Sequence, residues 1–216
     1  MDFENFRGLV QQALTEDIGA GDLTTRTLVP EGEKAEATII ARQRLVAAGL
    51  PLVPLVFQEL DPAVRTLIRV EEGETVEAGS VLIELEGEAA GILTGERTAL
   101  NFIQNLCGIA TFTARFVEAA GNNSVEIMDT RKTLPGFRKL QKYAVETGGG
   151  VNHRFGLYDS ILVKDNHLSV VGRLGPGRIQ RALTLCRQTF PDKEIEIEVE
   201  NRQELEEALA GHADII

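Results

Sequence analysis

The sequence contains no tryptophan and only two cysteines, and aromatic residues make up just 5% of it. Two cysteines in 216 residues exclude a disulfide-dense secreted fold, so both are expected to be buried free thiols of a cytoplasmic protein. Long hydrophobic runs are also missing. The longest covers residues 45–57 and is interrupted by Pro51 and Pro54, which excludes a membrane-spanning helix. The acidic, mixed first ten residues do not have the pattern of a secretory signal peptide.

Positive charge is scarce and unevenly distributed. The chain has 22 Lys and Arg against 33 Asp and Glu, a net charge of -11. Residues 129–167 reverse this balance, with seven basic and four acidic side chains. A nucleic-acid surface needs many clustered cations, so the acid surplus argues against one. The cationic stretch instead predicts a local pocket for a small anion.

The first half of the chain has a mixed helix and strand pattern. It predicts an N-terminal α+β domain, sandwich-like, over residues 1–120. Helices are expected at 3–14, 51–60 and 96–119, strands at 35–41, 65–70 and 81–85, and a turn-rich stretch at 15–25. The last helix links the two halves and is expected to end at Gly121.

The second half alternates strands and helices, which predicts a parallel sheet with right-handed crossovers. Strands are expected at 125–128, 160–163, 194–199 and from 213, with helices at 137–147, 178–190 and 201–211. Asn201 and Glu204 are expected to form a capping box. The fold class is therefore α/β, with a parallel α/β barrel over 121–216. About four strands are too few to close a barrel, so it is expected to be truncated, its C-terminal part missing.

The cations of the second half follow the predicted strands. Arg131 and Lys132 come after the strand at 125–128, and Lys164 follows the strand at 160–163. Sites in parallel α/β folds form at the carboxyl ends of strands, so these three should converge on one rim. Arginine forks and mobile lysines match a ligand with several negative charges. Three further cations share one helix and are expected to form a solvated face: Arg138, Lys139 and Lys142.

The segment EIEIEVE, residues 194–200, places four glutamates on one strand face and three aliphatic residues on the other. It is open whether this is an outer strand with a wet face or a barrel strand whose inward acids meet the cationic rim. In the second case, Glu198 or Glu200 would face a cationic centre of the substrate.

Four segments together carry a specific resemblance: EDIGAGDLTT, GERTALNFIQNLCGIAT, EIEVENRQELEEAL and the long stretch from DTRKT to KDNH. In this order they resemble the quinolinate phosphoribosyltransferase family, the decarboxylating nicotinate-nucleotide pyrophosphorylases, over essentially the whole chain. The resemblance implies phosphoribosyl transfer from phosphoribosyl pyrophosphate to quinolinate, with loss of CO2, in NAD biosynthesis. It also implies Mg2+ with the phosphoribosyl donor, and a homodimer with a shared active site that could assemble further.

The resemblance also implies roles for individual residues. Substrate binding is expected from Thr130, Arg131, Lys132, His153, Arg154 and Lys164. Arg97 would be lent by the neighbouring subunit. Glu198 would bind substrate near the ribose as a catalytic carboxylate that stabilises positive charge, and it is a candidate Mg2+ ligand; Lys132 would be a second catalytic residue. In the family, a strand carrying Leu-Asp-Asn and glycine-rich phosphate loops follow the point at which this sequence ends, Ile216.

The sequence leaves three alternative functions. One is a paralogue of the same fold with another substrate, such as the pyrophosphorylase-like proteins found with molybdenum transport genes. Another is an aldolase-like barrel in which Lys164 or Lys132 forms a Schiff base. A lipoyl-type carrier is the weakest, because its hairpin needs a lysine and none lies between Lys34 and Lys132.

Overall fold

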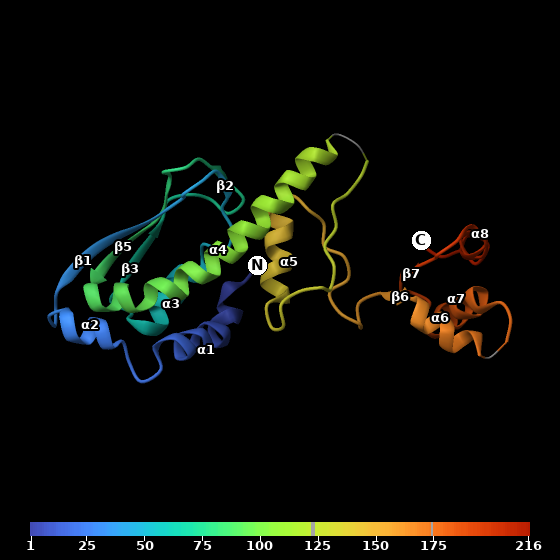
Figure 1. Cartoon of the computed structure of the whole chain (residues 1–216), viewed down its shortest axis with the longest axis horizontal. Coiled ribbons are helices and arrows are strands. Elements are labelled where there is room, and N and C mark those ends of the chain that lie inside the picture. Colours follow the sequence, from blue (N-terminus) through green and yellow to red (C-terminus); the bar gives the residue numbers. More distant parts are fainter. Residues whose placement is uncertain (122–123, 174) are drawn as a thin grey trace. The chain divides into compact units, whose positions relative to one another are not determined.

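The computed structural model describes residues 1–121, 124–173 and 175–216. The chain forms two compact units, Met1–His153 and Arg154–Ile216, each with its own hydrophobic core (Figure 1). In the described part of the chain, no helix has both the length and the apolar character needed to cross a membrane. The sequence predicts a domain boundary between residues 120 and 121, which is earlier in the chain than the boundary between the compact units. The predicted domains, 1–120 and 121–216, stay a prediction.

A three-stranded antiparallel sheet forms one layer of the first unit, in the order β1-β5-β3. These strands are β1 (Lys34–Ile40), β3 (Arg65–Ile68) and β5 (Val81–Glu88), and they confirm the three strands predicted in this half. Along β1, Ala35 and Ala37 are partly buried whereas Glu36 and Thr38 are exposed. One face of the sheet therefore meets the core and the other meets water. A short second ribbon pairs β2 (Leu45–Val46) with β4 (Thr75–Val76).

Helices α3 (Leu52–Leu60) and α4 (Ala89–Ala120) pack on each other and on the sheet (Figure 1). Helix α3 begins directly after Pro51, as predicted. The turn before it is fixed by Glu72, whose carboxylate accepts the N–H groups of Gly49 and Leu50 at 2.8 and 2.7 Å. Gly49 has φ +79°, and a Cβ there would lie 2.3 Å from Leu106 Cδ1. This turn therefore requires glycine.

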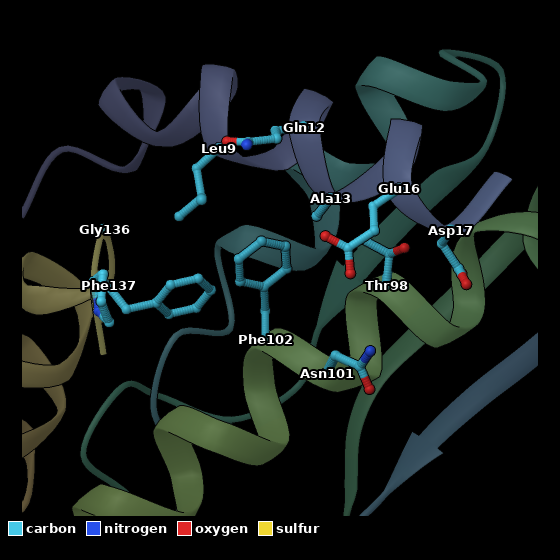
Figure 2. A pocket seen from close by; sticks show the side chains of 11 residues that line it. Leu9, Gln12, Ala13, Glu16, Asp17, Thr98, Asn101, Phe102, Gly136 and Phe137 are labelled. Carbon is cyan, nitrogen blue, oxygen red and sulfur yellow. The ribbon is translucent and has the colours of Figure 1, made fainter. Parts of the chain in front are cut away.

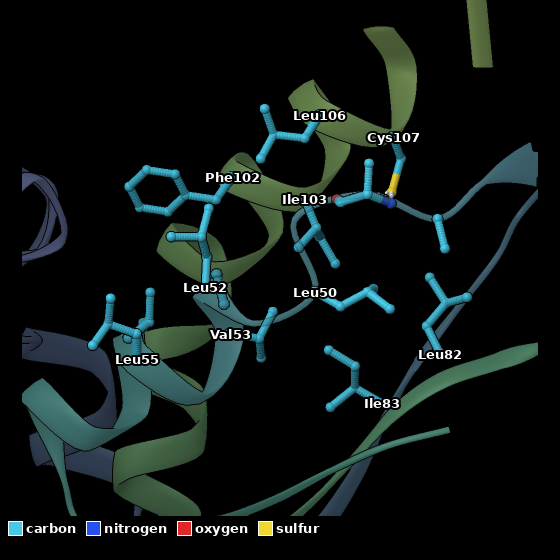
Figure 3. Close-up of a cluster of buried hydrophobic side chains, with 14 of the residues drawn as sticks. Leu50, Leu52, Val53, Leu55, Leu82, Ile83, Phe102, Ile103, Leu106 and Cys107 are labelled. Atoms are coloured by element: carbon cyan, nitrogen blue, oxygen red, sulfur yellow. Dashed lines mark hydrogen bonds between the residues drawn. The ribbon is translucent and has the colours of Figure 1, made fainter. Parts of the chain in front are cut away.

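The core of the first unit lies between these helices and the sheet (Figure 3). Aliphatic and aromatic side chains from α3, β5 and α4 meet there, and each contributes about 1.5–3 kcal/mol through burial. The side chains labelled in Figure 3 are Leu50, Leu52, Val53, Leu55, Leu82, Ile83, Phe102, Ile103, Leu106 and Cys107.

Helix α4 begins at Ala89, earlier than the predicted start at residue 96. Gly91 and Gly95 weaken the helix propensity of this first stretch by about 1 kcal/mol each relative to alanine. Packing offsets that cost, because a Cβ on Gly95 would lie 2.7 Å from Phe57 Cε1 and the bare glycine lets α4 approach α3 closely. The helix ends at Gly121, as predicted.

The N-terminal segment is more helical than its sequence suggested. A 3-10 turn η1 (Phe3–Phe6) leads into α1 (Arg7–Ile18), and α2 spans Leu23–Leu28. The expectation of a turn-rich stretch over 15–25 is therefore wrong outside residues 19–22. Asp22 begins α2 by accepting the N–H of Thr25 at 2.9 Å. Hydrogen bonds from the Thr25 hydroxyl and backbone keep the pKa of Asp22 below its usual value.

The strand expected at 125–128 is wrong. Within the described residues, Met128 alone of this segment pairs, in an isolated parallel bridge with Val151. Val125 is 61% exposed, so this segment has no core within the described residues to pack against. The helix that follows, α5 (Arg138–Thr147), agrees with its prediction.

The described residues of the second unit form parallel strands and three helices. Strands β6 (Ile161–Val163) and β7 (Ile195–Ile197) pair in parallel, which confirms that part of the predicted sheet. The helices are α6 (Asp165–Gly172), α7 (Arg178–Thr189) and α8 (Arg202–Ala210). Helix α6 was not predicted, and the strand expected from residue 213 reduces to a parallel bridge of Ile215 with Glu196. The small core includes Val163, Leu168, Ile179, Ile195 and Ile197.

The predicted capping box of α8 forms only in part. Asn201 accepts the N–H of Glu204 at 3.0 Å, as expected of an N-cap. The Glu204 carboxylate, however, accepts the N–H of Glu200 at 2.9 Å and pairs with Arg178 at 2.5 Å. These two partners draw the carboxylate away from the Asn201 N–H and lower the pKa of Glu204.

Candidate active site

The candidate residues are distributed over both compact units. Five belong to the first unit: Arg97, Thr130, Arg131, Lys132 and His153. Three belong to the second unit: Arg154, Lys164 and Glu198. The structure brings candidates together within each unit. Convergence of Arg131, Lys132 and Lys164 on one rim stays a prediction.

In the first unit, the loop at residues 130–132 borders a cavity of about 290 Å³. Thr130 folds this loop, because its Oγ1 accepts the N–H of Lys132 at 3.1 Å. Lys132 is exposed, and both residues line the cavity. The remaining lining residues are Ile109, Asp129, Thr133, Gln141, Lys142 and Val145. The cavity thus combines two lysines with one carboxylate and two threonine hydroxyls.

Arg131 is half-buried, and its Nε has no hydrogen-bond partner within the described residues. A buried donor without an acceptor costs about 1–3 kcal/mol. An anionic ligand would remove this cost, and the guanidinium fork matches the two oxygens of a carboxylate. Anion binding by Arg131 stays a prediction, and its unpartnered Nε is the observation behind it.

Lys142 is not on a solvated face, so that expectation is wrong for this residue. Its side chain is only 1% exposed, and Nζ forms an ion pair with the Asp129 carboxylate, itself 7% exposed. The same Nζ donates to the His153 carbonyl oxygen at 3.0 Å. Of the other two cations on this helix, Lys139 is exposed as predicted, whereas Arg138 is half-buried and donates to Thr133 Oγ1 at 3.1 Å.

His153 lies at the end of the first unit, after the three glycines at 148–150. These glycines allow close contact with α4. A Cβ on Gly148 would lie 2.3 Å from the Ala110 carbonyl oxygen, and one on Gly150 would lie 2.9 Å from Thr113 Cγ2. The His153 N–H donates to Asp129 Oδ1 at 2.9 Å. The structure thus joins His153 to the residue that directly precedes the 130–132 loop.

In the second unit, Lys164 and Glu198 form an ion pair with Nζ and Oε1 3.1 Å apart. Each residue follows its strand, β6 or β7, and because the strands are parallel their carboxyl ends lie at one edge. The side chains are 43% and 50% exposed, so a ligand can reach both. The alternation predicted for 194–200 is also present, with Ile195 and Ile197 buried and Glu198 exposed.

Arg154 opens the second unit and is 8% exposed. Its Nη1 donates to the Ser160 carbonyl oxygen at 3.2 Å. This bond holds the guanidinium beside the segment that leads into β6.

Arg97 lies on α4 with its side chain exposed, and it has no hydrogen-bond or ion-pair partner among the described residues. The adjacent Thr98 borders a different cavity, of about 530 Å³, between α1, α4 and the turn at 135–137 (Figure 2). This cavity contains none of the candidate residues. Its charged lining residues are Glu16 and Asp17, which suit an anion poorly.

Neither cysteine is activated as a nucleophile. Burial raises the pKa of Cys107 to about 11, and burial also raises the pKa of Cys186. Both thiols are free, as the sequence predicted, but only Cys107 is buried; Cys186 is half-buried, so the expectation of burial is wrong for it. In the described ranges, no three His, Cys, Asp or Glu side chains form a metal-binding group.

Two family models match the chain in sequence order. The quinolinate phosphoribosyl transferase N-terminal domain matches residues 22–107, and the corresponding C-terminal domain matches residues 109–216. The chain belongs to the quinolinate phosphoribosyl transferase family. The resemblance stated from the sequence is therefore confirmed.

Relatives in this family include the probable nicotinate-nucleotide pyrophosphorylase [carboxylating] of Bacillus subtilis. It is 42% identical over 217 residues, covering 100% of this chain and 73% of the relative. The Mycobacterium leprae nicotinate-nucleotide pyrophosphorylase [carboxylating] is 40% identical over 218 residues, covering 100% of this chain and 75% of the relative. This chain spans about three quarters of both relatives.

Solved structures of the family share the α/β fold of this chain. NadC from Streptococcus pyogenes matches with a TM-score of 0.91 and 36% identity over 99% of this chain and 74% of that chain. The nicotinate-nucleotide pyrophosphorylase from Francisella tularensis matches with a TM-score of 0.89 and 37% identity over 99% and 73%. Family membership leaves no basis for the aldolase-like and carrier alternatives.

Proposed function

We propose that this quinolinate phosphoribosyl transferase family member transfers the phosphoribosyl group of phosphoribosyl pyrophosphate to quinolinate. The products are nicotinate mononucleotide, pyrophosphate and CO2, within NAD biosynthesis. The chain is accordingly a pentosyltransferase of the nicotinate-nucleotide diphosphorylase (carboxylating) type. The names of its relatives state this activity, and neither name is that of a paralogue with another substrate.

The observation that carries this proposal is the half-exposed Lys164–Glu198 pair at the carboxyl ends of two parallel strands. Quinolinate has two ring carboxylates, and the transferred ribose becomes positively charged during the reaction. A ligand carboxylate can replace Glu198 as the partner of Lys164. The freed Glu198 carboxylate can then face the ribose.

The first unit supplies further cations for the dicarboxylate. Arg131 offers its unsatisfied Nε and its fork, and Lys132 is exposed beside the cavity. Thr130 and His153 complete the proposed binding set here, and Arg154 completes it in the second unit. Holding both carboxylates aims the pyridine nitrogen at the anomeric carbon, and such orientation lowers the barrier by itself.

In the transfer step, the pyridine nitrogen forms a bond to the anomeric carbon while the bond from that carbon to pyrophosphate breaks. Glu198 stabilises the oxocarbenium-like ribose in between. The ring carboxylate next to the nitrogen then leaves as CO2, and a proton replaces it on the carbon. Lys132 serves as the second catalytic residue by stabilising negative charge on the ring or on the departing pyrophosphate.

Glu198 is also the proposed protein ligand of Mg2+. Magnesium sites commonly use one or two carboxylates together with substrate phosphates, so a single glutamate fits this role. When bound, the ion neutralises charge on the pyrophosphate. The orientation of quinolinate by the cations does not depend on it.

The function is tested by measuring products and binding. Incubation with quinolinate, phosphoribosyl pyrophosphate and Mg2+ should release nicotinate mononucleotide, pyrophosphate and CO2 in equal amounts. Calorimetric titration should show quinolinate binding at least tenfold more tightly than nicotinate, which lacks one carboxylate. Equal affinities, or nucleotide formation from nicotinate alone, would contradict the proposal.

We also propose that the chain forms a homodimer in which Arg97 reaches the partner's site. The exposed face of α4 supports this, because Leu93, Arg97, Gln104 and Phe112 recur on it at helical spacing, with Leu93 and Phe112 49% and 59% exposed. Arg97→Ala and Lys164→Ala should each abolish most activity. Mixing them should restore about a quarter of wild-type activity, because half of randomly mixed dimers are mixed and each has one of its two sites intact. No recovery despite subunit exchange would mean that Arg97 serves no partner.

The finer architecture is a proposal as well. We assign the three-stranded sheet and its helices to a sandwich-like N-terminal α+β domain, divided from the second domain at residues 120 and 121. We assign the β6 and β7 units to part of a parallel α/β barrel. The cytoplasmic location expected from the sequence stays a prediction.

A further inference from the structure

Both backbone groups of His153, its N–H and its carbonyl oxygen, are hydrogen-bonded to the two members of one buried ion pair. Its N–H donates to Asp129 Oδ1 at 2.9 Å, and its carbonyl oxygen accepts from Lys142 Nζ at 3.0 Å. The two charged groups also pair with each other, with side chains 7% and 1% exposed. Such a closed arrangement leaves the main chain at His153 little freedom to shift.

The same pair fixes a second element of the candidate site. Asp129 directly precedes the 130–132 loop, and its own N–H donates to the Val151 carbonyl oxygen at 3.1 Å. In the amide orientation that satisfies both of its ends, Asn152 donates to Asp129 Oδ2 at 2.6 Å and to the Lys142 carbonyl oxygen at 3.0 Å. Two separate candidate segments therefore share one buried carboxylate.

Buried ion pairs are poor stabilisers, because desolvation of both charges offsets their attraction, and apolar replacements of similar size often serve the fold equally well. Their better-attested use is to select one arrangement among several. The Lys142 and Asp129 side chains also border the 290 Å³ cavity formed by the loop. The pair is thus placed between the main-chain groups it fixes and the space in which a ligand would lie.

We propose that Asp129 and Lys142 are a positioning pair that sets His153 and the 130–132 loop in the arrangement that receives the quinolinate carboxylates. This inference rests on the proposed function. Neither residue is assigned contact with the substrate; both act through His153, Arg131 and Lys132. The chemical class they serve is a small aromatic dicarboxylate.

The test is the double variant Asp129→Asn/Lys142→Met, which removes both charges together and keeps similar side-chain volumes. We expect the folded protein to persist, with a melting temperature within a few degrees of wild type. The KM for quinolinate should rise by about tenfold or more, whereas the KM for phosphoribosyl pyrophosphate should change less than twofold. A general loss of structure would raise neither constant selectively.

A second variant and a control distinguish loss of the positioning role from misfolding. Asn152→Ala removes the bonds to Asp129 Oδ2 and to the Lys142 carbonyl oxygen, keeps both charges, and should raise the quinolinate KM by about threefold. Leu52→Ala, in the core of the first unit away from the cavity, should lower the melting temperature without changing either KM. If the double variant fails to fold, Asn152→Ala decides the question. The proposal is overturned if the folded variants bind quinolinate as wild type does, or if both KM values rise together.

Wild-type activity is measured first. If the unaltered chain forms no nicotinate mononucleotide, the proposed function fails. The positioning role can then still be followed by calorimetry with quinolinate alone. If the wild type is active and the variants keep the wild-type quinolinate KM, the function stands and only the positioning role fails.

Discussion

Two lysine–carboxylate pairs of the same chemistry occupy opposite environments in this chain. Lys142 and Asp129 are almost fully buried and share the backbone of His153. Lys164 and Glu198 are 43% and 50% exposed and pair with each other. In the buried pair, either charge alone would lie uncompensated in a poorly solvated interior. In the exposed pair, water screens each charge, and a ligand can replace one partner at small cost.

The difference separates two tasks that a cation-rich site must combine. Some charges must hold the chain in place, and these have to be saturated with protein partners. Others must be ready to bind substrate, and these have to keep weak or incomplete partners. Arg131, with its unsatisfied Nε, belongs to the second group.

The largest effect on activity is expected at Arg131, whose buried Nε has no hydrogen-bond partner among the described residues. Arg131→Ala should lose two charge-assisted hydrogen bonds of about 1.5–3 kcal/mol each, or roughly a hundred- to ten-thousand-fold in kcat/KM. Steady-state kinetics with quinolinate measure this. Arg131→Lys should also be costly, because a point charge cannot reproduce the fork. A loss smaller than threefold would remove Arg131 from the binding set.

The comparison of the two pairs is tested most directly by truncating each lysine. Lys142→Met should lower the free energy of unfolding by about 3–5 kcal/mol, because it leaves the Asp129 charge buried and unpaired. Lys164→Met should change it by at most about 1 kcal/mol, as expected for an exposed pair. Urea denaturation of the two variants provides the measurement. Equal losses of stability would mean that burial does not distinguish the pairs.

Glu198 should separate binding from turnover. Glu198→Gln keeps the shape and removes the charge, so we expect kcat to fall by about a hundredfold or more. Quinolinate affinity should stay nearly unchanged, because this charge acts mainly in the transition state. Single-turnover kinetics and calorimetry measure the two quantities. A variant that binds quinolinate far more weakly yet turns over normally would show that Glu198 has the opposite role.

The smallest effect on activity is expected at Cys107. Cys107→Ser should keep activity within about twofold, since no covalent nucleophile is needed.

The Cys107 thiol should make the stability of the folded protein depend on pH. Burial raises its folded-state pKa from the ordinary value of 9.0 to about 11, so the folded protein keeps a proton that the unfolded chain releases. Stability from this group is full below about pH 9 and is lost as the pH rises to about 11, at up to roughly 1.4 kcal/mol per pH unit. Melting temperatures across this range should fall less steeply for Cys107→Ser than for wild type.

What the sequence predicted well depended on short-range regularity. The two-residue alternation at 194–200 and the cations directly after strands follow from strand geometry, so the Lys164–Glu198 meeting point could be anticipated. The start of α3 after Pro51 and the end of α4 at Gly121 are likewise local signals. The family could be named because its motifs are contiguous.

What the sequence missed depended on contacts between distant segments. A lysine on a helix among other cations looks solvated, and only the approach of Asp129 and His153 buries Lys142. The segment 125–128 has strand-like residues, but among the described residues its only strand partner is Val151. Helix α4 extends over Gly91 and Gly95 because α3 packs there, which no propensity scale contains.

Helix α4 also sets the distance between two parts of the molecule. The exposed Arg97 and the Thr113 that touches the glycine segment before His153 lie on the same unbroken helix. Sixteen residues at 1.5 Å per residue place them about 24 Å apart along its axis. If Arg97 serves the partner's site, this helix fixes the spacing between the substrate-binding group that a subunit lends and the glycine segment before its own His153. A kink anywhere in that interval would misalign both sites of a dimer at once, without altering a single residue that touches substrate.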